Sequence, residues 1–166
     1  MDTGPVGLIS KLTIGEEETA SSLHDRLSQL GAQTLEQGLR QLESNTIRFD
    51  EQNHDEATHA RPLTKADGIL DWSLSARQIV QRFRGMTPWP GCRWTVGGET
   101  VKILGMSTSD ETGRVGELLS LTNEGMTIGC TDGSIRISKL QRPNRGPVTA
   151  REYAQAMNLS IGQILS

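Results

Sequence analysis

The chain has 166 residues, of which 34% are hydrophobic and 4% aromatic, so we expect a modest, mainly aliphatic core in one domain or two small units. It has no apolar run near the about 20 residues of a membrane span, and its first residues lack the basic start and cleavage site of a secretory signal. The net charge of −3 is uneven: residues 1–60 carry eleven acidic and four basic side chains, and residues 61–166 carry thirteen basic and nine acidic ones. This asymmetry predicts two units, the second able to meet a polyanion, although uneven local composition would explain it equally well.

The first part of the chain combines a short apolar segment with a leucine-rich pattern. Val6–Ile9 follows the turn-forming Asp2–Pro5 and is predicted to form a strand. After the acidic Glu16–Glu18, leucines at helical spacing predict a helix that ends at Gly31, followed by a second helix that reaches Leu42. One strand and two helices cannot close a core, so we expect the chain to begin inside a domain.

Residues 44–64 are polar and aperiodic, a composition typical of a linker. They include His54 and His59, with Asp55 and Glu56 between them. We interpret these histidines as solvated linker residues, because zinc sites usually present closely spaced ligands on fixed elements. The sequence therefore predicts no metal site.

The second part of the chain alternates short β-like runs with glycine turns. Ser73 can cap a helix that reaches Phe83, and Thr149 with Glu152 forms a capping box for a final helix ending at Met157. The expected strands lie at 92–96, 100–104, 115–121, 126–130 and 135–140. Five short strands with a helix at each end favour an α+β fold built on a small OB-like β-barrel rather than a parallel sheet.

Side chains able to carry catalysis are scattered along the sequence. Cys92 and Cys130 lie far apart without CxxC spacing, and we interpret them as reduced thiols of a cytoplasmic protein. The sequence has no GxSxG elbow, glycine-rich phosphate loop or Cys/His/Asp cluster. The residues alone therefore show no complete catalytic set.

Basic residues give a stronger indication of function. Five of them and no acidic residue lie between Ser134 and Arg151, and Pro143, Gly146 and Pro147 place the middle of this run on a loop. Basic loops beside a barrel suit phosphate contacts, which supply affinity without reading sequence. The alternative is a solvated run of charge.

The aromatic residues favour a structural role. Only Trp89, Trp94 and Tyr153 could stack on bases, which poorly supports a single-strand binder with aromatic platforms. Trp72, Trp89 and Pro90 are instead predicted to pack and to fix turns, because a buried tryptophan contributes a large apolar area.

Several motifs resemble one enzyme family, the methionyl-tRNA formyltransferases. Those similar to the start of its C-terminal domain are Pro62–Asp67, Asp71–Ala76 (DWSLSA), Arg84-Gly85 and Pro88–Gly91 (PWPG). The segment Asn158–Leu165 resembles the end of that domain, whereas Asp2–Pro5 and the helix around residues 19–27 resemble the end of the Rossmann-like formyltransferase domain. The resemblance covers essentially the whole chain, and its DW…PWPG part is the most specific.

The resemblance implies a division into three parts. Residues 1–47 would be the end of the catalytic domain, residues 48–65 a linker, and residues 66–166 the OB-like tRNA-binding domain. The chain is then expected to be the C-terminal half of a monomeric, cytoplasmic enzyme of translation initiation without membrane contact.

The same resemblance implies a chemistry. The family moves a formyl group from formyltetrahydrofolate to the amino group of methionine on initiator tRNA, using an Asn, a His and an Asp, of which the Asp corresponds to Asp2. Its carboxylate would orient the imidazole and favour the protonated form, so that the His stabilises the oxyanion of the intermediate. The Asn and His are expected upstream of Asp2, with most of the folate pocket, so this chain alone is predicted to be inactive.

The tRNA-binding role is expected to rest on a basic channel along the inner side of the tRNA. The residues predicted to form it are Arg61 and Lys65 in the linker, Arg82 and Arg84 on the first helix of the barrel domain, and Lys139, Arg142 and Arg145 in the late loop. Two other hypotheses stay open: a stand-alone nucleic-acid-binding module, and the C-terminal part of another folate enzyme such as a nucleotide-sugar formyltransferase or a formyl-folate hydrolase. The PWPG motif, together with the Asp71-Trp72 pair that precedes it, favours the tRNA enzyme over another folate enzyme.

Overall fold

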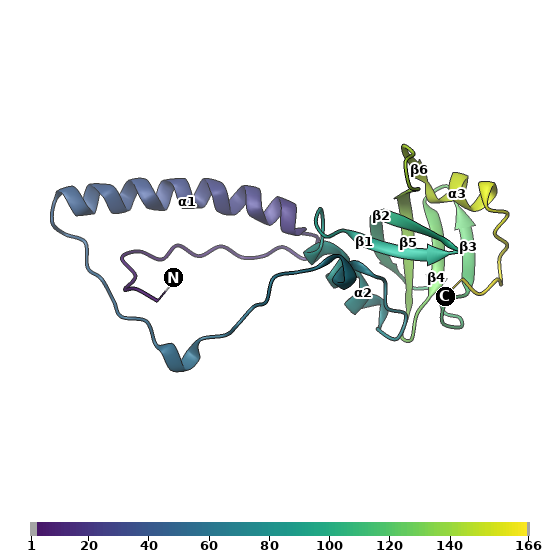
Figure 1. Ribbon diagram of the computed structural model, residues 1–166, viewed down its shortest axis with the longest axis horizontal. Coiled ribbons are helices and arrows are strands. Elements are labelled where there is room, and N and C mark those ends of the chain that lie inside the picture. The colour runs from purple at the N-terminus through teal and green to yellow at the C-terminus, as the bar shows by residue number, and fades with distance from the viewer. Residues whose placement is uncertain (1–2, 166) are drawn as a thin grey trace. The chain divides into compact units, whose positions relative to one another are not determined.

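The computed structural model describes residues 3–165, which divide into two compact units, Met1–Pro62 and Leu63–Ser166 (Figure 1). The first unit contains one long helix, α1 (Ala20–Glu43), and a short 3-10 turn, η1 (His54–Glu56). Thr19 caps α1, because its side chain accepts a hydrogen bond from the backbone N–H of Ser22. Val6 and Asp50 form an isolated bridge through two backbone hydrogen bonds of 2.9 and 3.0 Å.

Two expectations for this unit are wrong. No strand forms at Val6–Ile9 beyond the bridge, and α1 continues through Gly31 instead of breaking into two helices. The partly buried positions Leu23, Leu30, Thr34 and Gly38 form one helical stripe, so the leucine pattern belongs to a single helix. A glycine inside a helix costs only about 1 kcal/mol, too little to end a capped helix of this length.

Replacing Gly31 by alanine is therefore expected to stabilise α1 by about 0.5–1 kcal/mol, because a Cβ at this position would meet nothing within 4 Å. Circular dichroism should show more helix and a later thermal loss of the helical signal. Gly162→Ala is the contrasting variant: it also has open space, but its φ of +87° strains any L side chain. A destabilising Gly31→Ala would instead indicate a left-handed helix end at Gly31.

The second unit is built on one antiparallel sheet (Figure 1). The strands, in their order across the sheet, are β1 (Cys92–Val96), β2 (Glu99–Ser109), β5 (Ser134–Gln141), β4 (Gly125–Gly129) and β3 (Leu118–Thr122), and β6 (Pro147–Thr149) pairs with β5. The α+β class is confirmed. The sequence missed β6, which forms inside the expected loop, and it underestimated the length of β2.

The expectation of a closed barrel needs correction, because the sheet is open. Within residues 3–165 its end strands β1 and β3 do not pair with each other. Other segments lie along both edges instead. Ile69 forms a parallel bridge with Arg93 beside β1, and Ile164 forms an antiparallel bridge with Glu117 beside β3. Each edge is thus covered over part of its length: the Leu70 N–H donates to the Arg93 carbonyl at 2.8 Å, and the Gly162 N–H donates to the Leu118 carbonyl at 2.8 Å.

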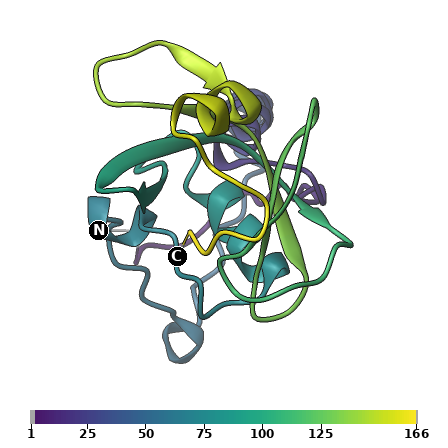
Figure 2. The same cartoon turned by 90° about the vertical axis from the view of Figure 1, so that its right-hand side faces the viewer.

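Two α-helices and one 3-10 turn accompany the sheet: α2 (Ala76–Gly85), α3 (Ala150–Ala156) and η2 (Lys65–Gly68). Ser75, not Ser73, caps α2; Ser73 donates a hydrogen bond to the Asp71 carboxylate from its backbone N–H at 3.0 Å and another from its hydroxyl. The predicted capping box at Thr149 is confirmed. Figure 2 shows α3 beside the loop that leads into β6. No helix in the described part of the chain has the length and apolarity to cross a bilayer.

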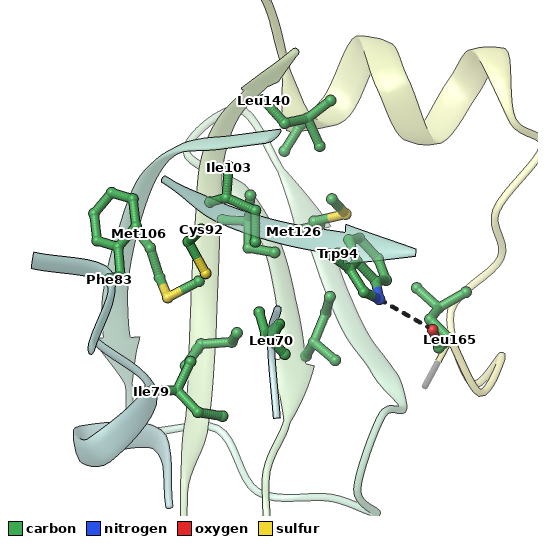
Figure 3. Packing of buried hydrophobic residues seen from close by; sticks show 14 of the residues in the cluster. Leu70, Ile79, Phe83, Cys92, Trp94, Ile103, Met106, Met126, Leu140 and Leu165 are labelled. Atoms are coloured by element: carbon green, nitrogen blue, oxygen red, sulfur yellow. Dashed lines mark hydrogen bonds between the residues drawn. The ribbon is translucent and has the colours of Figure 1, made fainter. Parts of the chain in front are cut away.

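The core lies between α2, the inner face of the sheet and the C-terminal segment (Figure 3). Phe83 and Ile79 of α2 face the sheet, and Trp94 of β1 lies near Leu165. The indole N–H of Trp94 donates to the Leu165 carbonyl at 3.3 Å, and its ring meets Trp72 edge-to-face with centroids 6.0 Å apart. This contact attaches the last described residues to the sheet.

Candidate nucleic-acid interface

The first group of basic residues lies where η2 meets α2. A guanidinium N–H of Arg82 donates to the Asp67 carbonyl at 3.0 Å. The Asp67 carboxylate accepts hydrogen bonds from the backbone and hydroxyl of Thr64, at 2.7 and 2.8 Å, and so fixes the start of η2. These bonds hold the exposed Lys65 on a short turn against α2, while Arg84, further along the helix, is half-buried. The bond from Arg82 to Asp67 thus joins the turn that carries Lys65 to the helix that carries Arg82.

The second group lies on the β5–β6 hairpin, which contains Lys139, Arg142 and Arg145. Lys139 is exposed on β5, opposite Thr149 of β6. Arg142 Nε donates to both carboxylate oxygens of Glu99, at 3.1 and 2.9 Å. Arg145 is exposed at the end of a turn, which is closed by a hydrogen bond from the Arg145 backbone N–H to the Arg142 carbonyl at 3.2 Å. The hairpin therefore presents its cations on an ordered turn.

A hollow that the sequence did not predict lies beside this hairpin. Its volume is about 400 Å³, and it is lined by Arg93, Thr100, Val101, Lys102, Gln141, Arg142, Pro143 and Asn144. Arg93 and Lys102 were missed because each is a lone basic residue in its strand. The sequence does hold one signal: side chains in a strand point alternately to its two faces, and Arg93 stands between Cys92 and Trp94, which face the core. Arg93 must therefore point to the opposite face of the sheet.

The two remaining predicted site residues are Asp2 and Arg61. Asp2 lies outside the described residues. Arg61 belongs to the first unit, where it is exposed and donates to the Pro62 carbonyl at 3.1 Å.

The late basic run divides between two places. Arg136 pairs with Glu124 at 2.6 Å, and Arg151 bonds the side chain of Asn123, so both lie by the turn between β3 and β4. Of the five, Lys139, Arg142 and Arg145 lie in the part of the hairpin from Lys139 to Thr149, where β5 pairs with β6, whereas Arg136 lies earlier on β5.

The aromatic residues also differ from expectation. Trp94 and Tyr153 are core residues, 2% and 1% exposed, and Trp72 packs against the core as predicted. Trp89 is 58% exposed, so its predicted packing role is wrong. The loop after α2 buries Pro90 and turns the preceding indole outward.

The two cysteines cannot serve as nucleophiles at neutral pH. Both are free and buried, and burial raises the pKa of Cys92 and that of Cys130 from 9.0 to about 11. Among residues 3–165 no three His, Cys, Asp or Glu side chains gather where they could hold a metal ion.

We expect an alkylating reagent near pH 8, about the ordinary pKa of a thiol, to leave both cysteines unmodified until the chain is denatured. Mass spectrometry with and without urea measures the labelling, and rapid labelling of the folded chain would contradict the expectation.

The raised pKa of both thiols also predicts how stability depends on pH. Because their pKa is higher in the folded than in the unfolded chain, the folded state holds more protons at alkaline pH. The contribution of the buried thiols to the free energy of unfolding should thus be complete below about pH 9 and should fall as the pH rises toward 11. Urea unfolding midpoints measured below and above pH 9 test this dependence.

Comparison with known proteins adds an independent finding. The model of the family described as "Formyl transferase, C-terminal domain" matches residues 62–158. The methionyl-tRNA formyltransferase of Geobacter metallireducens is 36% identical over 162 residues, covering 98% of this chain and 52% of that protein, and the one of Xanthomonas euvesicatoria is 37% identical over 159 residues, covering 94% and 52%. The chain thus spans about half the length of the curated relatives it matches.

Solved structures show a similar fold. A variant of HypX from Aquifex aeolicus matches with a TM-score of 0.74 at 16% identity, covering 96% of this chain and 30% of that one. The N-formyltransferase from Helicobacter canadensis, in complex with folinic acid and dTDP-3-aminofucose, matches with a TM-score of 0.63 at 16% identity, covering 86% and 51%.

Proposed function

The chain belongs to the formyl transferase C-terminal domain family, and from this premise we propose that it is the tRNA-binding part of a cytoplasmic, monomeric methionyl-tRNA formyltransferase. The whole enzyme would transfer a formyl group from formyltetrahydrofolate to the amino group of methionine on initiator tRNA. The observation that carries this proposal is the 36% identity to a methionyl-tRNA formyltransferase along 98% of the chain, through both units. The solved sugar N-formyltransferase, at 16% identity, supports the shared fold alone.

We assign the tRNA contacts to the two basic groups of the second unit. Lys65, Arg82 and Arg84 act from η2 and α2, and Lys139, Arg142 and Arg145 act from the hairpin; Arg61 contributes from the first unit. Guanidinium and ammonium groups on ordered turns bind backbone phosphates and release counterions from the RNA, which supplies affinity without reading the sequence. This division of labour needs no reactive group in the second unit.

The first unit is proposed to be the end of the formyltransferase domain (residues 1–47), joined to the second by the linker of residues 48–65. Its long helix supports this, because α1 has no buried residue and leaves a row of leucines uncovered. Leu27, Leu35, Leu39 and Leu42 are between 47% and 64% exposed. So large an exposed apolar surface is typical of a helix that packs against further polypeptide.

Catalysis is proposed to need groups that this chain does not supply. Asp2 would orient an imidazole, and the imidazole and an amide side chain would stabilise the oxyanion. We expect the 166-residue chain alone, given formyltetrahydrofolate and charged initiator tRNA, to show no formylation above background. The complete Geobacter metallireducens enzyme is the positive control. Turnover by the chain alone would overturn this part of the proposal.

A salt titration tests the binding role directly. The logarithm of the association constant for initiator tRNA, measured by fluorescence anisotropy, should fall linearly with the logarithm of the salt concentration, with a slope of about −1 for each phosphate neutralised. A dTDP-sugar should not compete. A flat salt response, or competition by the sugar nucleotide, would favour a different enzyme of the folate group.

A further inference from the structure

Two cations stand side by side on the outer face of the sheet. Arg93 of β1 and Lys102 of β2 are register partners, so their side chains project from directly opposite positions on one face. Like charges at such positions repel, and both residues are half-buried. Among residues 3–165 neither side chain forms an ion pair with a carboxylate. The fold thus keeps together two charges that nothing in the described chain neutralises.

The hollow gives these charges a shared space. It is lined by three cations, Arg93, Lys102 and Arg142, and by no acidic residue of the described chain, and so favours an anion. Glu99 bonds Arg142 but does not line the hollow. Gln141, the register partner of Lys102 on β5, adds an amide that can donate hydrogen bonds. At about 400 Å³ the space falls within the range of small-ligand sites, roughly 300–1,000 Å³.

The loop that carries an exposed tryptophan contacts one of these cations. The Lys102 ammonium lies 3.5 Å from the Pro88 carbonyl, and a Cβ on Gly91 would come within 2.7 Å of Lys102 Cε, so the loop from Pro88 to Gly91 rests on this lysine. Trp89 stands in that loop with 58% of its surface exposed. An aromatic face beside a phosphate site is the arrangement with which proteins stack a nucleotide base.

We propose that this hollow is an RNA-backbone subsite, in which Arg93, Lys102 and Arg142 hold a phosphodiester and Trp89 stacks on an adjacent base. The inference rests on the proposed function and adds three residues to it. A guanidinium and an ammonium that repel each other in the free protein are both satisfied when a phosphate lies between them. RNA is favoured over a simple inorganic anion because RNA offers a base to the indole beside the phosphate.

The test compares single and double variants of the full chain. Arg93→Gln and Lys102→Gln should each weaken binding of initiator tRNA roughly tenfold at low salt and reduce the salt slope by about one. Trp89→Leu should weaken binding without changing that slope. Arg114→Gln is the matched control, because it removes an exposed cation, paired with Glu117, that does not line the hollow.

Thermal melting separates binding from structure. Relief of the repulsion should leave the melting temperature of the Arg93→Gln, Lys102→Gln double variant unchanged or raised. A lower melting temperature would assign these residues to stability and overturn the proposal. Normal tRNA binding by the double variant would overturn the subsite while the proposed function stands. If the unaltered chain itself shows no salt-dependent tRNA binding, the proposed function fails first.

Discussion

Replacing Trp94 by alanine is expected to lower the free energy of unfolding of the second unit by about 3–5 kcal/mol, which is a large share of the stability of a small domain. The indole is 2% exposed, packs edge-to-face on Trp72 and donates to the Leu165 carbonyl at 3.3 Å. Its removal leaves a cavity and takes away one of the hydrogen bonds that hold the C-terminal segment, which stays bridged to Glu117 through Ile164. Urea unfolding followed by circular dichroism measures the loss.

Trp89→Ala is the matched control, because it deletes the same side chain where it is 58% exposed. We expect it to cost less than about 1 kcal/mol. Trp94→Phe separates the contribution of packing from that of the hydrogen bond. It keeps most of the packing but leaves the buried Leu165 carbonyl without its donor. Equal losses from the two alanine variants would show that Trp94 does not anchor the core.

Local features of the fold could be predicted from the sequence. The capping box at Thr149 follows from residues three positions apart, and five of the six strands of the second unit follow from short β-like runs separated by glycine turns; β6 does not. The continuity of α1 was missed because Gly31 suggested a helix end. The partly buried side chains before and after Gly31 lie on one face, and this shared face keeps the helix continuous. The segments that lie along the two edges of the sheet were missed for a different reason. The bridges of Ile69 and Ile164 join segments far from their partners in the chain, which no local pattern encodes.

The candidate site shows the same limit. Sequence identified cations on the hairpin and on α2 from charge and turn residues, but it could not pair Arg93 with Lys102, because that depends on the register of β1 on β2. Nor could it separate Trp89 from Trp94, which differ only in the direction that the backbone gives them. The family resemblance rested on motifs rather than geometry, and the match over residues 62–158 confirms it.

Neutralising the hairpin is expected to produce the largest functional loss. A triple variant with Lys139, Arg142 and Arg145 changed to glutamine should bind initiator tRNA at least about a hundredfold more weakly at low salt, with the salt slope reduced by about three. Arg142 needs separate treatment, because its loss leaves the Glu99 carboxylate unpaired and facing the RNA. Adding Glu99→Gln removes that repulsion and should restore part of the affinity. Anisotropy titrations over a range of salt concentrations measure both effects.

The control is a second triple variant with the same change in net charge, made of Arg114→Gln, Arg136→Gln and Arg151→Gln. These residues bond Glu117, Glu124 and Asn123, near β3 and the turn that follows it, and none lines the hollow beside the hairpin. If position matters, this variant should keep most of its affinity, because short-range phosphate contacts survive while only the screened long-range field is reduced. If the two triple variants weaken binding equally, net charge alone attracts the RNA and the hairpin is not a docking surface.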